Sequence, residues 1–103
     1  MQVFNVVWGR GAYTEDDTIN TYAGVHGTYL AEADAKKGLE DCKQEFLNEI
    51  LNNPDLSDDD KESFRHNVQI YGSVNDDYFE IDYTVDDRPV EIYIQLTHTR
   101  VQD

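Results

Sequence analysis

EADAKKGLEDCKQEFLNEIL, residues 32–51, carries the clearest helical pattern in the chain. Apolar residues recur in it at steps of three and four, at Ala35, Leu39, Cys42, Phe46 and Ile50. Because an α-helix has 3.6 residues per turn, these side chains share one face, which Leu47 and Leu51 widen. Burying each large apolar side chain is worth about 1.5–3 kcal/mol before entropy is subtracted. A lone helix cannot bury this face, so we expect a sheet to lie against it.

The segments before this helix predict two strands. Val3–Trp8 is β-branched and aromatic, and it is apolar on both faces, which favours a central strand. The triplet Gly9-Arg10-Gly11 is expected to end that strand, and a polar loop is expected up to Thr18. Thr18–Leu30 predicts a second strand, in which two glycines indicate a bulge or a bend.

A second, shorter helix is expected after residue 54. Pro54 disfavours helix at the residue before it, so the long helix should stop there. Ser57 and Asp60 have the spacing of a capping box in an acidic variant, which predicts a helix start. We expect this helix to end near Arg65, with Phe64 as its anchor.

Three further strands are predicted in the last third of the chain. They are Asn67–Tyr71, with Val68 and Ile70 inward, Tyr78–Val85 and Val90–Thr99. The last two alternate between apolar and polar residues and are joined by a four-residue hairpin loop, Asp86–Pro89. The resulting order is β-β-α-α-β-β-β.

This order predicts an α+β fold of one globular domain, residues 1–103. The strands are one-sided, so we expect an antiparallel sheet with the long and the short helix packed on one face.

The charge balance restricts the classes of partner. Twenty-two acidic residues face eight basic ones, which gives a net charge of −14. Direct nucleic-acid binding and binding to anionic membranes are disfavoured, because both need Lys and Arg. A basic protein would instead be attracted. Two simpler explanations are that the acidity serves solubility or adaptation to high salt.

The sequence indicates a cytoplasmic protein. The single cysteine allows no internal disulfide, which is typical of a reducing compartment. The first residues lack the basic region of a signal peptide. No apolar run approaches the ~20 residues that a membrane span needs.

No motif in the sequence indicates a metal or a cofactor. Asp55, Ser57 and Asp59 have the first spacings of a calcium loop, but Asp60 occupies the required glycine position. Helix capping explains the same residues. The three histidines and Cys42 show no paired ligand spacing. We therefore expect neither a metal nor a cofactor.

The sequence does not favour an enzyme. Cys42 lies on the apolar stripe of the helix, where a thiol has a raised pKa and is inert. Gly9-Arg10-Gly11 lacks the third glycine of a nucleotide-binding loop, and Arg10 is expected to serve as a counter-ion. No nucleophile elbow or oxyanion-hole motif is present.

The candidate binding residues gather on and around the last hairpin. Glu80 and Asp82 alternate by two, so they should project from one sheet face, together with Tyr78 and Tyr93. The full set that we predict is Asp76, Asp77, Tyr78, Glu80, Asp82, Asp86, Asp87, Glu91 and Tyr93. Further acidic groups occur at residues 15–17 and 55–62. The simpler interpretation is a solvated face with polar loops.

In size, acidity and lack of catalytic motifs the chain resembles two groups of small proteins. These are phage-encoded nucleic-acid mimics, including anti-CRISPR and anti-restriction proteins, and immunity proteins that neutralise nuclease toxins. The resemblance is one of type and covers no defined motif. It implies an inhibitor whose partner is a basic, nucleic-acid-handling protein. The alternative is a structural or adaptor protein, self-associating as a homodimer through a strand edge, whose acidity serves solubility. A third interpretation, a small hydrolase or metal-binding domain, requires turnover or bound metal.

Overall fold

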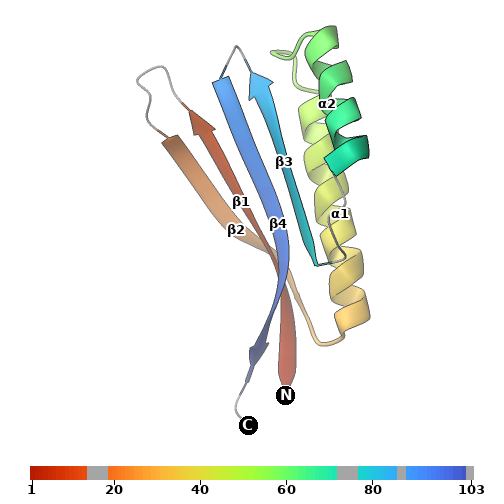
Figure 1. Cartoon of the computed structure of the whole chain (residues 1–103). Helices are drawn as coiled ribbons and strands as arrows, with labels where there is room; N and C mark the ends of the chain where they lie inside the picture. The colour runs from red at the N-terminus through yellow and green to blue at the C-terminus, as the bar shows by residue number, and fades with distance from the viewer. Residues whose placement is uncertain (14–18, 72–76, 86–87, 102–103) are drawn as a thin grey trace.

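The computed structural model describes residues 1–13, 19–71, 77–85 and 88–101, which form one antiparallel sheet and two helices (Figure 1). Along the chain the elements are β1 (Gln2–Tyr13), β2 (Ile19–Tyr29), α1 (Glu32–Leu51), α2 (Asp58–Tyr71), β3 (Tyr78–Val85) and β4 (Arg88–Arg100). The observed order in this part of the chain is therefore β-β-α-α-β-β. The predicted α+β class is confirmed.

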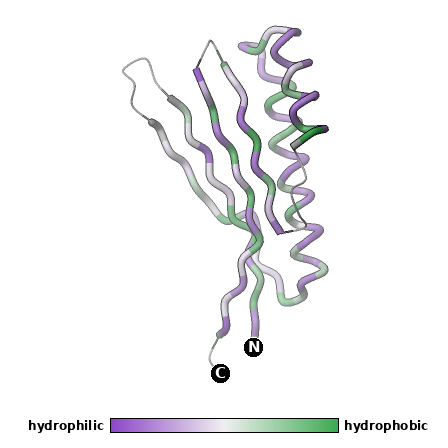
Figure 2. The backbone as a smooth tube through the Cα atoms, viewed as in Figure 1, coloured by the Kyte–Doolittle hydropathy of each residue, from purple (hydrophilic) through white to green (hydrophobic). Residues whose placement is uncertain are grey.

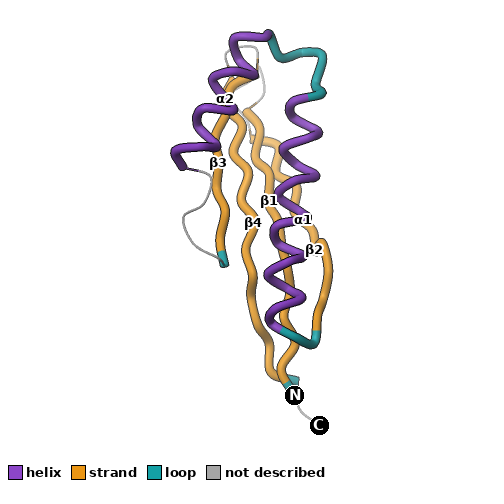
Figure 3. The backbone as a smooth tube through the Cα atoms, turned by 90° about the vertical axis from the view of Figure 1, so that its right-hand side faces the viewer, coloured by secondary structure: helices purple, strands orange, loops and turns teal. Residues whose placement is uncertain are grey.

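The sheet has the strand order β2-β1-β4-β3. β1 is central, as its apolar sequence predicts, and it pairs with β4 from Gln2–Arg100 to Ala12–Val90. Both helices cover the same face of the sheet, and the opposite face is bare in the described residues (Figures 1 and 3). The predicted one-sided packing is confirmed.

The core lies between this covered face and the helices. β3 and β4 alternate between hydrophobic and hydrophilic residues along their length (Figure 2). Their inward residues face one another across the ladder, so that Phe79 pairs with Ile94 and Ile81 with Ile92. The predicted stripe of α1 closes the core: Ala35, Leu39, Cys42 and Ile50 are buried, and Phe46, Leu47 and Leu51 pack against them.

Gly9-Arg10-Gly11 does not end the first strand, contrary to the prediction. β1 continues to Tyr13, and the β1–β2 ladder runs on to the pair of Tyr13 with Ile19. Glycine disfavours a strand only weakly, and here both neighbouring strands supply hydrogen-bonding partners. Of the expected loop, residues 14–18 lie outside the described residues.

The predicted strand Asn67–Tyr71 is also wrong, because these residues form the end of α2. Phe64 is 2% exposed, and Val68, one turn later, packs against the core. Ile70, which was expected to point inward, is 56% exposed. A short apolar run fits both the strand and the helix period, and packing on the sheet through Phe64 and Val68 selects the helix.

Three local predictions are confirmed. The Ser57 Oγ accepts a hydrogen bond from the Asp60 N–H (3.1 Å), as expected of a helix cap. α1 ends at Leu51, before Pro54. The register between β2 and β1 shifts at Val6/Val7, which is the bulge that the glycines of β2 predicted.

Neither described helix combines the length and the apolar character that crossing a membrane would require.

Replacing Phe64 tests how α2 is seated. The Phe64 ring meets the Tyr83 ring edge-on, with centroids 5.5 Å apart. Phe64→Ala should lower the free energy of unfolding by about 3–5 kcal/mol, because it leaves a cavity. Ile70→Ala should change it by less than ~0.5 kcal/mol, because the side chain is exposed. Urea denaturation measures both. A large loss in Ile70→Ala would instead support an inward-facing residue 70.

Candidate functional site

Five of the six predicted binding residues that the structure describes share the uncovered face of the sheet, hereafter the open face. Tyr78, Glu80 and Asp82 project from β3, and Glu91 and Tyr93 project from β4. Asp77 precedes β3 and is exposed. The remaining predicted residues, Asp76, Asp86 and Asp87, lie outside the described residues.

The strand register brings the carboxylates of the open face together. Asp82 lies directly opposite Glu91, and Glu80 lies opposite Tyr93. Like charges placed opposite one another in an antiparallel ladder destabilise the pairing. In the described part of the chain, none of these three carboxylates has a Lys or Arg within ion-pair distance. The arrangement therefore leaves negative charge uncompensated at this point.

The cations of the sheet lie on its other side. In the strand register, Arg10 pairs with Ile92, Arg88 with Val85, and Arg100 with Gln2. Because side chains alternate along a strand and Ile92 is buried under the helices, these positions face the helix side. The helices pair some of their acids with cations, at Glu32–Lys36 (3.8 Å), Glu40–Lys43 (3.9 Å) and Glu62–Arg65 (3.4 Å), while the three Asp in the first turn of α2 have no such pair among the described residues. Within the described strands, however, the open face carries charge of a single sign.

Two tyrosines stand among these carboxylates. The Tyr93 ring lies against the backbone of buried Gly9, where any side chain on residue 9 would overlap the ring. Tyr93 is nevertheless 41% exposed. The Tyr78 hydroxyl donates a hydrogen bond to Glu80 Oε2 (2.9 Å). Burial, followed by this hydrogen bond and the nearby negative charge, raises the pKa of Tyr78, so its hydroxyl stays a donor at neutral pH.

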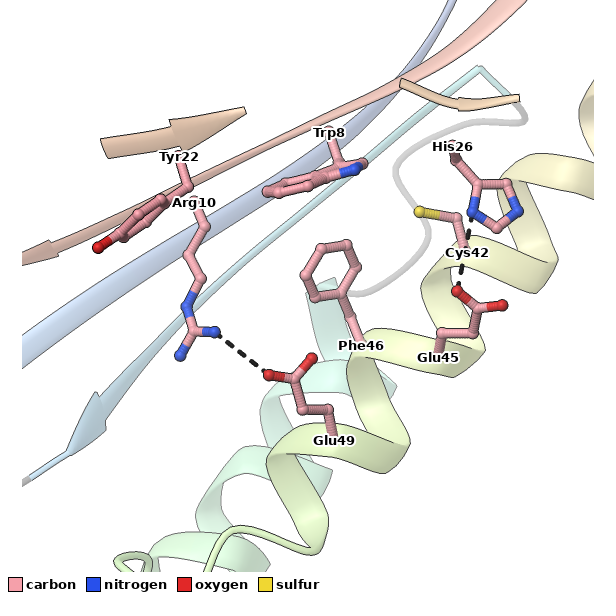
Figure 4. Close-up of a pocket in the computed structure, with 8 residues that line it drawn as sticks. All are labelled: Trp8, Arg10, Tyr22, His26, Cys42, Glu45, Phe46 and Glu49. Atoms are coloured by element: carbon pink, nitrogen blue, oxygen red, sulfur yellow. Dashed lines mark hydrogen bonds and ion pairs between the residues drawn. The ribbon is translucent and has the colours of Figure 1, made fainter. Parts of the chain in front are cut away.

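A cleft on the helix side was missed by the sequence analysis. It has a volume of about 350 Å³ and lies between β1, β2 and α1 (Figure 4). It is lined by Trp8, Arg10, Tyr22, His26, Cys42, Glu45, Phe46 and Glu49. The helix positions could have been suspected, because Glu45 and Glu49 flank the apolar stripe of α1. Arg10 could not, because the predicted break at Gly9-Arg10-Gly11 hid its inward register.

The polar groups of the cleft already contact one another. Arg10 Nη1 lies 3.4 Å from Glu49 Oε1, and its Nη2 donates to the Tyr83 hydroxyl (3.1 Å). His26 Nδ1 lies 3.7 Å from Glu45 Oε2. Between these two contacts the Trp8 and Phe46 rings meet edge-on, with centroids 5.5 Å apart (Figure 4). The arrangement ties α1 to β1 and β2, with Arg10 as the expected counter-ion.

Cys42, which lines this cleft, is not an activated nucleophile. It is 2% exposed, and burial, with a smaller effect of Glu45, raises the pKa of its thiol to about 11. At neutral pH the thiol is therefore protonated. Within the described residues, no three His, Cys, Asp or Glu side chains come together as metal ligands would.

Comparisons with protein-family models, with curated proteins and with solved structures found no match for this chain.

Substitution of Gly9 tests the contact between Gly9 and the Tyr93 ring. Gly9→Ala should lower the free energy of unfolding by about 1–3 kcal/mol, because its methyl group overlaps the ring. In a Tyr93→Ala background the same change should cost less than ~0.5 kcal/mol, since the obstacle is gone and alanine suits a strand better than glycine. A double-mutant cycle in urea measures the coupling. Equal costs in both backgrounds would contradict the contact.

Cys42 should react slowly with thiol reagents while the protein is folded. A pKa raised from 9.0 to about 11 lowers the thiolate fraction roughly a hundredfold near pH 8. Colorimetric thiol titration in buffer and in urea measures this ratio. An exposed thiol, in Cys42→Ala/Gln44→Cys, should react at similar rates in both.

The same shift gives a pH dependence of stability. Because the folded state favours the protonated Cys42 thiol, this preference contributes fully to stability below pH 9, and the contribution is lost as the pH rises toward 11. Comparison of wild type with Cys42→Ala across this range isolates it. A contribution that grows with pH would contradict the assignment.

Proposed function

We propose that this protein is an inhibitor that docks a basic, nucleic-acid-handling protein on its open face and so keeps nucleic acid away from it. The observation that carries the proposal is the group Glu80, Asp82 and Glu91, held side by side on a sheet with no compensating cation among the described residues. The proposed mode of action is that of anti-CRISPR, anti-restriction and nuclease-immunity proteins.

The spacing of the carboxylates supports imitation of a phosphate backbone. Alternate residues of a strand are ~6.6–6.8 Å apart, so Glu80 and Asp82 are separated by about that distance. Phosphates along one strand of DNA rise by ~3.4 Å each along the helix axis and also rotate about it, so neighbouring phosphates are ~6.5–7 Å apart. A cationic groove that accepts neighbouring phosphates would also accept these carboxylates.

Tyrosines next to the carboxylates supply the packing that charge alone does not. Tyr93 combines an exposed surface with a fixed ring, because it rests on Gly9. A pre-positioned aromatic ring gives contact area at low entropic cost, and tyrosine is enriched at binding hot spots. The hydrogen bond from Tyr78 holds the Glu80 carboxylate in place before binding.

The remaining acidity supports long-range attraction. A net charge of −14 raises the encounter rate with any cationic partner. On the helices the acids are interspersed with Lys and Arg, so we assign the specific contact to the open face. The proposal includes a cytoplasmic location, because such targets act there and the single cysteine suits a reducing compartment.

A screen of purified nucleases tests the inhibition. Restriction endonucleases, RNA-guided nucleases and nuclease toxins are each incubated with the protein before labelled DNA or RNA is added. We expect inhibition of at least one of these enzymes, competitive with nucleic acid and weakened by salt, since the contact is electrostatic. Absence of inhibition and of binding across the panel would count against the proposal.

Charge reversal locates the contact. Glu80→Lys/Asp82→Lys should slow association with the inhibited nuclease about tenfold at low salt, with a smaller change in dissociation. The matched control is Asp41→Lys/Asp55→Lys, which alters net charge equally at exposed positions on the helical layer. Surface plasmon resonance measures both. Equal slowing in the two variants would show that only the overall charge controls association, and would refute the open face as the contact site.

A further inference from the structure

Among the described helices and strands, the edge strand β2 differs from the others in having no Asp, Glu, Lys or Arg. Ile19–Tyr29 contains no Asp, Glu, Lys or Arg, and in the sequence this uncharged run extends from Thr18 to Ala31. β2 pairs with β1 alone and lies at the end of the strand order. Its outward peptide groups can therefore pair with a further strand.

The other edge of the sheet is protected, which makes the contrast informative. β3 carries the exposed carboxylates Glu80 and Asp82 and packs against α2. Charged side chains on an edge strand oppose pairing with another chain. β2 has no such protection, and it exposes apolar side chains: Tyr22 is 61% exposed and Val25 is 62% exposed.

We propose that β2 pairs antiparallel with β2 of a second copy of this chain. Two copies with a net charge of −14 repel one another, so they can meet only where each is uncharged. β2 is such a region, and pairing through it keeps the acidic open faces of β3 and β4 at the far ends of a continuous sheet. An identical strand also satisfies two-fold symmetry, since the same residues meet from both sides.

The bulge in β2 sets the extent of this pairing. The shift of register at Val6/Val7 leaves His26 without a partner in β1. Before the bulge the ladder from Ile19 to Val25 is regular, and a bulge turns an edge away from continued pairing. The interface therefore uses the part of β2 up to Val25, and Tyr22 lies at its centre.

The salt dependence distinguishes this interface from the proposed inhibition. Salt screens the repulsion between two acidic copies, so dimerisation should strengthen as salt rises. Binding of a basic partner to the open face should weaken over the same range. Sedimentation equilibrium from micromolar to millimolar protein, at low and high salt, measures the first effect, so either proposal can fail without the other.

A lysine on each edge strand locates the dimer contact. Ala23→Lys places two cations beside the two-fold axis and should weaken dimerisation about tenfold, or ~1.4 kcal/mol. Thr84→Lys makes the same charge change at an exposed position on β3 and should leave the dimer intact. Circular dichroism confirms that both variants are folded.

Two results would overturn the proposal. One is that the protein stays monomeric at every protein and salt concentration. The exposed edge of β2 would then be available to pair with a strand of a different protein. The other is a dimer that Ala23→Lys and Thr84→Lys weaken equally, which would place the contact elsewhere. A Tyr22→Cys variant in a Cys42→Ala background should form an intermolecular disulfide in the dimer, since facing positions of an antiparallel pair suit disulfide geometry.

Discussion

Burial of one face of the sheet under the apolar stripe of α1 is the constraint on which the rest of the structure depends. The stripe from Ala35 to Ile50 closes over residues of β1 and β4, including Val6, Ile92 and Ile94, which are all fully buried. Because both helices lie on this side, the opposite face is bare in the described residues (Figure 3). One-sided packing thus creates the surface to which we assign function.

The distribution of charge also differs between the two sides of the sheet. Several acids on the helices are paired with cations, whereas the open face of the sheet brings Asp82 against Glu91 with no cation nearby among the described residues. A solubilising coat needs no such opposition, which costs stability. In our proposal a cationic partner offsets that cost.

The two ends of the sheet have opposite electrostatic character. β3 and β4 carry the carboxylates, while β2 is uncharged and exposes Tyr22 and Val25. A dimer through β2 would present two acidic faces at opposite ends of one extended sheet, and would double the apparent valency toward a basic partner.

The residue pattern alone was enough to predict the periodic elements, because in them the spacing of apolar residues matches the buried face. These are the stripe of α1, the cap at Ser57, and the alternation that places Glu80 and Asp82 on one face. The ambiguous segments were set by contacts between distant parts of the chain. Gly9 lies in a strand because two neighbours pair with it and Tyr93 rests on it, and residues 67–71 are helical because Phe64 anchors them to the core. The edge position of β2 and the cleft depend on strand order, which contacts between distant segments set and local pattern does not encode.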